Sequence, residues 1–330
     1  MVDKERGEFF EEQEENIEHK VTLTPQGDEE GKRIDAFLAE ELGLTRSYVQ
    51  KLIRLGNVEI SGIRRALKPA LKVTAEMAIH IVVPPAETLE IEPEPVKFGI
   101  IYEDPYIIVV NKPAGLVVHP APGNWHGTLV HGLLYKYRDM RKFDEEVRPG
   151  IVHRLDSGTS GLLVVARTPK ILQNLQNQFR SRSVEKKYLA LSCGKLRKAA
   201  GFIEEPIGRS QRNRLMMTVT DTGRPALTEY RILWTHQKYS FIECTLHTGR
   251  THQIRVHLKH RGCPIVGDGL YGTKQSLQRT PGRMFLHAWK LAFDHPINGS
   301  RMSFRACLPQ ELSLFLKNIH PLCQRLLGSY

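Results

Sequence analysis

Two short apolar runs enclose a turn rich in serine, glycine and threonine, and they fix the position of one acid. Residues 150–152 (Gly-Ile-Val) and 162–166 (Leu-Leu-Val-Val-Ala) each have the length and character of a buried strand. Asp156 lies between them in HRLDSGTSG, on a connection that a rigid scaffold would hold open to solvent. Without a second acid beside it, this carboxylate suits nucleophilic or single-base chemistry better than metal binding or paired acid–base hydrolysis. The alternative is that Asp156 caps a hairpin and pairs with Arg154.

The charge of the chain is distributed unevenly. Residues 1–30 contain eleven Asp/Glu and three Lys/Arg, a net charge of −8, whereas the whole chain carries +11. The other residues therefore carry +19, which is typical of a protein that binds a polyanion such as nucleic acid. A charge that serves solubility alone is the alternative. We predict that residues 1–30 form a disordered acidic tail.

Length and composition predict a soluble globular protein of about two domains. The chain has 330 residues, no apolar run long enough to span a membrane, and an acidic rather than signal-like N-terminus. Its five cysteines are scattered and form no CxxC pair, which favours free thiols in a reducing compartment over a zinc ribbon. We therefore expect a cytoplasmic location and no membrane partner.

Residues 31–84 form a predicted compact module. A first amphipathic helix begins near Ile34, Thr45 has the side chain of an N-cap, and Gly56 ends a second helix. Short strands are expected at residues 58–60 and 78–83. Residues 85–97 (PPAETLEIEPEPVK from Pro84) are rich in proline and glutamate and are predicted to be a linker.

The second helix of this module has a basic side. Arg46, Lys51 and Arg54 fall opposite its apolar residues, and Arg64 and Arg65 follow. A surface that contacts phosphates is the preferred interpretation, and an ordinary solvated face is the alternative. The stretch from Arg33 through RSYVQKLIRLGNVEISG (residues 46–62) resembles the small RNA-binding domain of the S-four type, named after a ribosomal small-subunit protein. The resemblance implies that these six arginines and lysines bind structured RNA.

From residue 98 onward, short β-rich runs alternate with helical ones. The pattern predicts an α+β domain, residues 98–330, on a large mixed, mainly antiparallel sheet with flanking helices. No GxGxxG follows a strand, so a doubly wound dinucleotide fold and a nucleotide cofactor are not expected. The expected strands include 107–110, 162–166, 188–191 and 241–246, and the expected helices 127–136, 171–179, 251–260 and 310–318.

Two more segments contain residues suited to chemistry on a base. RSVEKKYLAL (residues 182–191) could place Tyr188 at the start of a strand, where the ring can stack on a base and the hydroxyl can exchange a proton. A half-buried strand tyrosine is the alternative. LHTGRTHQIRVHLKHRG (residues 246–262) predicts a helix that Thr251 caps and Gly262 ends. Its arginines include a candidate partner for an active-site carboxylate.

The three histidines of that predicted helix do not predict a metal site. Residues 252, 257 and 260 do not reproduce the HExxH spacing, and the nearest acids, Glu243 and Asp268, lie off the helix. The sequence therefore predicts no bound metal.

Taken together, these segments resemble the pseudouridine synthases of the RluA/RluD type. Four blocks carry the resemblance, and LVVHPAPGN (residues 116–124) is more similar to the RluD branch. Together with the N-terminal module, the resemblance covers residues 31 to 310. The blocks are VNKPAG (110–115), PGIVHRLDSGTSGLLVVAR (149–167), EKKY (185–188) and TGRTHQIRVH (248–257).

The resemblance implies an activity and assigns roles to four residues. The reaction detaches uracil from its ribose, rotates it and reattaches it through carbon, without a cofactor. Asp156 matches the essential aspartate, which acts as a nucleophile at the sugar or the base ring, or as the base that starts a glycal route. Arg154 matches the residue that enters the stack when the uridine flips out. Tyr188 matches the aromatic that stacks on the flipped base, and Arg255 the partner that ion-pairs with the aspartate.

The expected substrate is structured RNA, most simply large-subunit ribosomal RNA or its assembling particle. Two other classes of function are alternatives to this one. An RNA-binding factor on a retired enzyme scaffold would be expected to lack Asp156, Tyr188 or Arg255, and all three are present. A metal-dependent nuclease would need clustered acidic and histidine ligands around Asp156.

Overall fold

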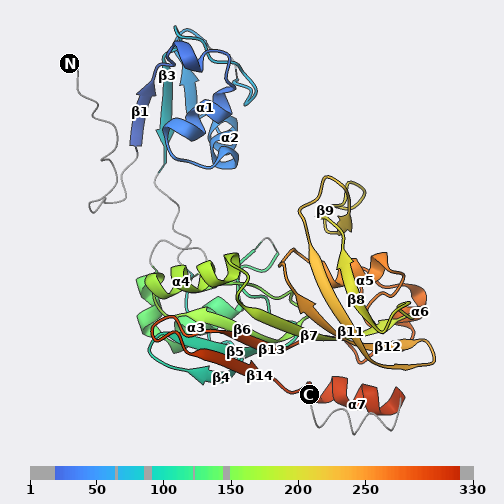
Figure 1. Ribbon diagram of the computed structural model, residues 1–330. Coiled ribbons are helices and arrows are strands. Elements are labelled where there is room, and N and C mark those ends of the chain that lie inside the picture. The colour runs from blue at the N-terminus through green and yellow to red at the C-terminus, as the bar shows by residue number, and fades with distance from the viewer. Residues whose placement is uncertain (1–18, 64–65, 85–90, 122, 144–148, 320–330) are drawn as a thin grey trace. The chain divides into compact units, whose positions relative to one another are not determined.

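The chain divides into two compact units, residues 1–88 and 89–330, which are described separately (Figure 1). The computed structural model describes residues 19–63, 66–84, 91–121, 123–143 and 149–319. The division between the units falls inside the segment predicted to be a linker. Within the described ranges, no helix combines the length and the apolar character needed to cross a membrane.

The first unit packs two helices against a three-stranded antiparallel sheet of order β1-β3-β2. Thr45 accepts a hydrogen bond from Tyr48 N, so the predicted N-cap of the second helix is confirmed. The apolar residues of both helices are buried against the sheet, and they include Phe37, Leu38 and Leu52. The elements are β1 (His19–Leu23), a 3-10 turn (Gly27–Glu29), α1 (Ile34–Glu41), α2 (Arg46–Arg54), β2 (Val58–Ile60) and β3 (Ile79–Val83).

Strand β1 corrects the prediction that residues 1–30 form one disordered tail. It pairs with β3 in antiparallel register from His19 opposite Val83 to Leu23 opposite Ile79. Val21 and Leu23 pack against the core of the unit, which explains why this segment folds although it adjoins an acidic stretch. Residues 19–23 (HKVTL) alternate polar and apolar side chains as a strand does, although the net charge of residues 1–30 is strongly negative. Residues 1–18 lie outside the described residues.

A buried carboxylate joins the two helices of the first unit. The side chain of Asp35 has no exposed surface. It accepts two hydrogen bonds from Arg33, one from Arg46 Nη2 at 3.1 Å and one from Gln50 Nε2 at 2.7 Å. These bonds, first of all those from Arg33, hold the pKa of Asp35 well below its usual range. Two of the arginines expected to bind RNA therefore also stabilise the fold.

We predict that Asp35→Asn destabilises the first unit by about 2 kcal/mol, because it weakens charge-assisted hydrogen bonds to a buried group while the arginines remain half-exposed. Hydrogen exchange of the β2 and β3 amides measures the change. Since the folded-state pKa is lowered, the stabilisation is present above the unfolded pKa and is lost as the pH falls. The difference between wild type and variant should therefore shrink in acid. Glu40→Gln, which breaks the exposed pair with Lys32, is the control and should change little.

The second unit is built on a nine-stranded sheet of order β4-β5-β6-β13-β7-β12-β11-β8, with β14 paired to β13 (Figure 1). Among the strands that the structure describes, only β6 and β13 pair in parallel, so the predicted α+β fold on a mainly antiparallel sheet is confirmed. Its strands are β4 (Gly99–Glu103), β5 (Ile107–Lys112), β6 (Ser160–Ala166), β7 (Glu185–Cys193), β8 (Ala200–Glu204), β11 (Leu227–His236), β12 (Tyr239–Leu246), β13 (Leu286–Asp294) and β14 (Arg301–Arg305).

Helices flank this sheet at positions close to those predicted. The apolar run of β6 is buried along its whole length, and α4 packs on this strand. A small hairpin pairs β9 with β10 outside the main sheet. These elements are α3 (Leu129–Lys136), a 3-10 turn (Arg138–Lys142), α4 (Pro169–Arg180), β9 (Ile207–Arg209), β10 (Met217–Val219), α5 (Gln253–His260), α6 (Lys274–Leu277) and α7 (Gln310–Ile319).

Two further segments differ from the sequence prediction. Residues 150–152 do not form a strand: Ile151 makes one isolated antiparallel bridge to Val165. Gly150 has φ +66°, and a Cβ there would lie 2.2 Å from Ala166 O, so the chain turns beside β6 instead of continuing along it. The predicted linker also ends early, because Ile91 packs against the core of the second unit and Glu94 N donates to His131 O.

Candidate active site

The four residues predicted to be catalytic line one cleft in the second unit. The cleft has a volume of about 630 Å³, and Arg154, Asp156, Tyr188 and Arg255 all contribute to its wall. Asp156 lies in the loop that leads into β6, Tyr188 in β7 and Arg255 in α5. Antiparallel pairing of β12 with β7 and of β7 with β13 brings these distant segments together.

Asp156 forms an ion pair with Arg255 at the cleft. Arg255 Nη1 donates to Asp156 Oδ2 at 2.9 Å, and the Asp156 side chain keeps 21% of its surface exposed. The backbone around it is a tight turn in which Thr159 N donates to Asp156 O. The alternative in which Asp156 pairs with Arg154 is therefore wrong, because the opposite charge comes from α5. The carboxylate is held at one oxygen and can reach a bound molecule with the other.

A second carboxylate, Asp268, holds Arg255 from the opposite side. Arg255 Nε and Nη2 donate to the two oxygens of Asp268 at 2.8 and 2.9 Å, in the bidentate geometry that only arginine allows. Asp268 is fully buried and also accepts hydrogen bonds from the backbone of Leu270 and Tyr271. Burial opposes ionisation of Asp268, but these contacts lower its pKa overall. The sequence prediction assigned no role to Asp268, because its pairing with Arg255 depends on how the chain turns after α5.

Tyr271 and His252 complete the support of this ion pair. The Arg255 guanidinium lies 4.8 Å from the centre of the Tyr271 ring, and the Tyr271 hydroxyl lies 2.8 Å from His252 Nδ1. His252 Nε2 in turn lies 3.9 Å from Asp156 Oδ2. His252, rather than the predicted Thr251, is the N-cap of α5, and it has the left-handed backbone angle φ +57°. Non-glycine residues are uncommon in that conformation. After Asp268, His252 is the second residue near Asp156 to which the sequence prediction gave no role.

Tyr188 is more buried than predicted. It is the fourth residue of β7 and not its first, and only 7% of its surface is exposed. Burial, followed by the negative charge of Asp156, raises the pKa of its hydroxyl well above the usual value. The hydroxyl therefore stays protonated at neutral pH and can donate a hydrogen bond inside the cleft.

Arg154 is exposed at the cleft, on the same loop as Asp156. Within the described part of the chain, no hydrogen bond or ion pair holds its guanidinium, so the side chain is able to change position. Arg180, Arg182 and Arg250 also line the cleft, which makes its wall strongly positive. Such a wall attracts phosphate groups.

The loop that carries Asp156 is anchored from behind by Lys112. This lysine is fully buried at the end of β5, and its ammonium donates to the carbonyls of Pro113, Leu116 and Ser157. Burial, followed by the positive charge of Arg283, lowers the pKa of Lys112 to about 7. Gly115 N donates to the same Ser157 carbonyl at 2.8 Å, so the residue next to Asp156 is fixed by two contacts.

The residues expected to bind RNA in the first unit fall into three groups. Arg33 and Arg46 pair with Asp35, although 45% and 51% of their side-chain surfaces remain exposed. Lys51 and Arg54 are exposed on α2. Arg64 and Arg65 lie outside the described residues.

Comparison with known proteins identifies the family to which this chain belongs. The family described as RNA pseudouridylate synthase matches residues 106–260. The RNA pseudouridine synthase YlyB of Bacillus subtilis is 40% identical over 91% of this chain and 98% of its own length. The chain belongs to the RNA pseudouridine synthase family. Because pseudouridine formation is an isomerisation, the predicted enzyme class is confirmed.

Further relatives support the membership of this chain in the same family. The ribosomal large subunit pseudouridine synthase D of Neisseria meningitidis is 41% identical over 89% of this chain and 80% of its own length. Among solved structures, human RNA pseudouridylate synthase domain containing 1 superposes with a TM-score of 0.53 at 28% identity, over 71% of this chain and 96% of that one. The likeness in structure confirms the fold class predicted from the sequence.

We predict that Arg255→Lys lowers the turnover of the synthase by about 100-fold or more. An ammonium is a point charge that cannot hold both oxygens of Asp268 while it contacts Asp156, so the Asp156 carboxylate loses its position. Single-turnover assays on a uridine-containing RNA measure the effect. Arg261→Lys, which alters an exposed pair with Glu205 just beyond the end of α5, is the matched control and should retain full activity. Equal turnover of the two variants would contradict the role given to the Asp156–Arg255–Asp268 arrangement.

Proposed function

We propose that the synthase isomerises specific uridines of large-subunit ribosomal RNA, with Asp156 as the catalytic carboxylate. The observation that carries this proposal is the partly exposed Asp156 carboxylate, held in a basic cleft by an arginine that a second, buried acid orients. The substrate class is supported by the relatives in Neisseria meningitidis and Nitrosomonas europaea, which are named as ribosomal large subunit pseudouridine synthase D. Ribosomal RNA modification also agrees with a cytoplasmic location.

Asp156 initiates the reaction in this proposal, at the sugar, at the base ring, or by removing a proton on a glycal route. Its negative charge is consumed or moved at that moment, and Arg255 would then be left as an uncompensated charge in a largely buried position. Asp268 prevents this, because it keeps Arg255 paired whatever Asp156 does. The group of two carboxylates and one arginine carries a net negative charge at the start, which favours a reactive Asp156.

The other cleft residues prepare the uridine for this step. The target bond is buried in stacked RNA, so the nucleotide must leave the stack before Asp156 can reach it. Arg154 is exposed and able to move, which suits insertion into the vacated position. The Tyr188 ring forms an apolar wall against the flipped base, and its protonated hydroxyl can exchange a proton late in the reaction.

The first unit supplies additional RNA affinity in this proposal, as a binding domain of the S-four type over residues 31–84. Lys51 and Arg54 are the residues of α2 whose charges are free of Asp35. An alternative of metal-dependent RNA cleavage is not favoured, since among the described residues Asp156 belongs to no group of three potential metal-binding side chains.

We predict that Asp156→Asn lowers pseudouridine formation by at least about a thousandfold while RNA affinity changes little, because the replacement has the same shape but no charge. The assay incubates full-length protein with unmodified large-subunit ribosomal RNA transcript and maps pseudouridine by carbodiimide-blocked reverse transcription. Asp294→Asn, which breaks an exposed pair with Arg301, is the matched control and should react like wild type.

The positions at which reverse transcription stops distinguish a pseudouridine synthase from an RNA-binding factor. New stops with wild type and control, and none with Asp156→Asn, support the proposal and name the modified uridines. RNA that is bound but unmodified, both as a transcript and in precursor particles from cells that lack the protein, would favour a binding factor and overturn the proposal. Turnover by Asp156→Asn above a few per cent of wild type would show that another group is the catalyst.

We predict that the double substitution Lys51→Gln and Arg54→Gln weakens RNA binding and reduces its salt dependence. A protein that makes fewer phosphate contacts releases fewer counterions when it binds. The slope of log affinity against log salt concentration should therefore become shallower by about 1.5. Filter binding over a range of salt concentrations measures the slope. A double substitution of Lys274 and Lys317 to glutamine removes the same charge from α6 and α7 and should leave the slope unchanged. An identical slope for wild type and the α2 variant would assign the first unit another role.

A further inference from the structure

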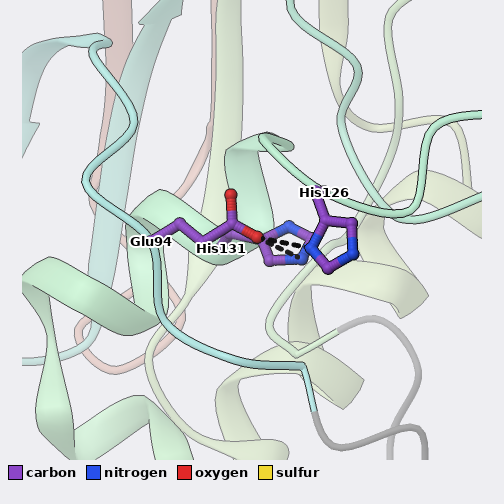
Figure 2. Close-up of side chains that lie close together, drawn as sticks. All are labelled: Glu94, His126 and His131. Atoms are coloured by element: carbon purple, nitrogen blue, oxygen red, sulfur yellow. Dashed lines mark hydrogen bonds and ion pairs between the residues drawn. The ribbon is translucent and has the colours of Figure 1, made fainter.

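Three side chains that the reaction does not use converge at the edge of α3. Glu94 precedes β4, His126 lies in the loop before α3, and His131 lies in the first turn of that helix. Figure 2 shows the Glu94 carboxylate pointing at both imidazole rings. Its Oε1 lies 2.9 Å from His126 Nδ1 and 3.4 Å from His131 Nε2, and one ligand atom of each residue lies within 4.8 Å of the other two. Two imidazoles and a carboxylate at such separations are a donor set that zinc prefers.

His131 is held as metal-binding histidines commonly are. Its side chain is 97% buried, and its other ring nitrogen, Nδ1, lies 2.7 Å from Thr128 Oγ1. In the tautomer with its proton on Nδ1, the ring donates to this hydroxyl, and the lone pair of Nε2 is then directed toward Glu94 and His126. Burial also lowers the pKa of His131, which keeps the ring in the neutral form that binds metals.

Glu94 is supported in a similar way. Its second oxygen, Oε2, accepts a hydrogen bond from Gly127 N at 2.8 Å, which leaves Oε1 directed at the two rings. The hydrogen bonds from His126 and Gly127 lower the pKa of Glu94, so the carboxylate is ionised. Glu94 and His131 are thus fixed by their surroundings, whereas 82% of the His126 surface is exposed.

A cluster without metal is the competing interpretation. Thr128 N also lies 3.2 Å from His131 Nδ1, and a hydrogen bond from that amide requires the ring proton to be on Nε2, which would then donate to Glu94. Metal binding exchanges this bond for one from Nδ1 to Thr128 Oγ1, which is the shorter contact. The exchange costs the backbone hydrogen bond and the direct contacts of Glu94 with the two rings, and two metal–nitrogen bonds and one metal–oxygen bond are gained.

We propose that Glu94, His126 and His131 form a site for one zinc ion. Three protein ligands with an exposed histidine leave a fourth coordination position on the solvent side. The ion would join the segment before β4 to the start of α3, two parts of the chain that already meet where Val96 packs against Gly132. The site therefore acts as a clamp at the beginning of the second unit, separate from the chemistry at Asp156.

The test uses the full-length chain without a histidine tag, stripped of metal by a chelator and then titrated with zinc chloride against a chromophoric competitor. We expect one zinc ion to bind with a dissociation constant in the micromolar range or tighter. Cobalt chloride should give the visible absorption bands of a four-coordinate cobalt ion. Zinc at a hundredfold excess over its dissociation constant should raise the midpoint of thermal unfolding by about 5 °C.

Two variants and one control make the result specific. His126→Ala removes an exposed ligand and Glu94→Gln removes the shared carboxylate, and each should weaken zinc binding by at least about tenfold. His260→Ala removes a histidine that also faces a glutamate, Glu205, but without a third ligand, and should bind like wild type. Failure of the wild type to bind zinc, or binding that survives both His126→Ala and Glu94→Gln, would overturn the proposal. Neither outcome depends on pseudouridine formation.

Discussion

One guanidinium shared by two carboxylates is the interaction on which the cleft around Asp156 depends. Arg255 holds the two oxygens of Asp268 and one oxygen of Asp156, and the Tyr271 ring covers its face. The buried Asp268 fixes the arginine, and the arginine fixes the partly exposed Asp156. This order of support means that Asp156 can change its charge or form a bond without leaving a buried arginine unpaired. It also explains why arginine and not lysine stands at residue 255.

The sheet supplies the rigidity that this arrangement needs. β6 and β7 are buried along most of their length, and they lie on either side of β13, so the loop of Asp156 and the ring of Tyr188 have fixed positions relative to each other. Lys112 adds a polar anchor behind the loop, through the carbonyl of Ser157. Arg154 lies at the exposed end of this scaffold, on the loop of Asp156, where we propose that it contacts the RNA.

Local signals in the sequence predicted the regular elements well and the irregular ones poorly. The helix expected at residues 171–179 is α4 (Pro169–Arg180), and Thr45 caps α2 as expected, because periodicity and capping act within a few residues. Residues 150–152 read as a strand, yet Gly150 turns the chain there, since its position beside Ala166 requires a positive φ. β1 was missed because its stability comes from pairing with β3, sixty residues away.

The sequence by itself determined the family, and it placed the candidate catalytic residues Asp156, Tyr188 and Arg255 in blocks whose order and spacing can be read directly. Beyond the pair of Asp156 and Arg255, which the resemblance implied, only the tertiary structure decided which charges meet. Asp268 pairs with Arg255, His252 approaches Asp156, and Arg33 and Arg46 turn toward Asp35. Glu94, His126 and His131 likewise meet only after folding. The physical reason is that such contacts depend on strand register and loop path, which bring together side chains that no local pattern connects.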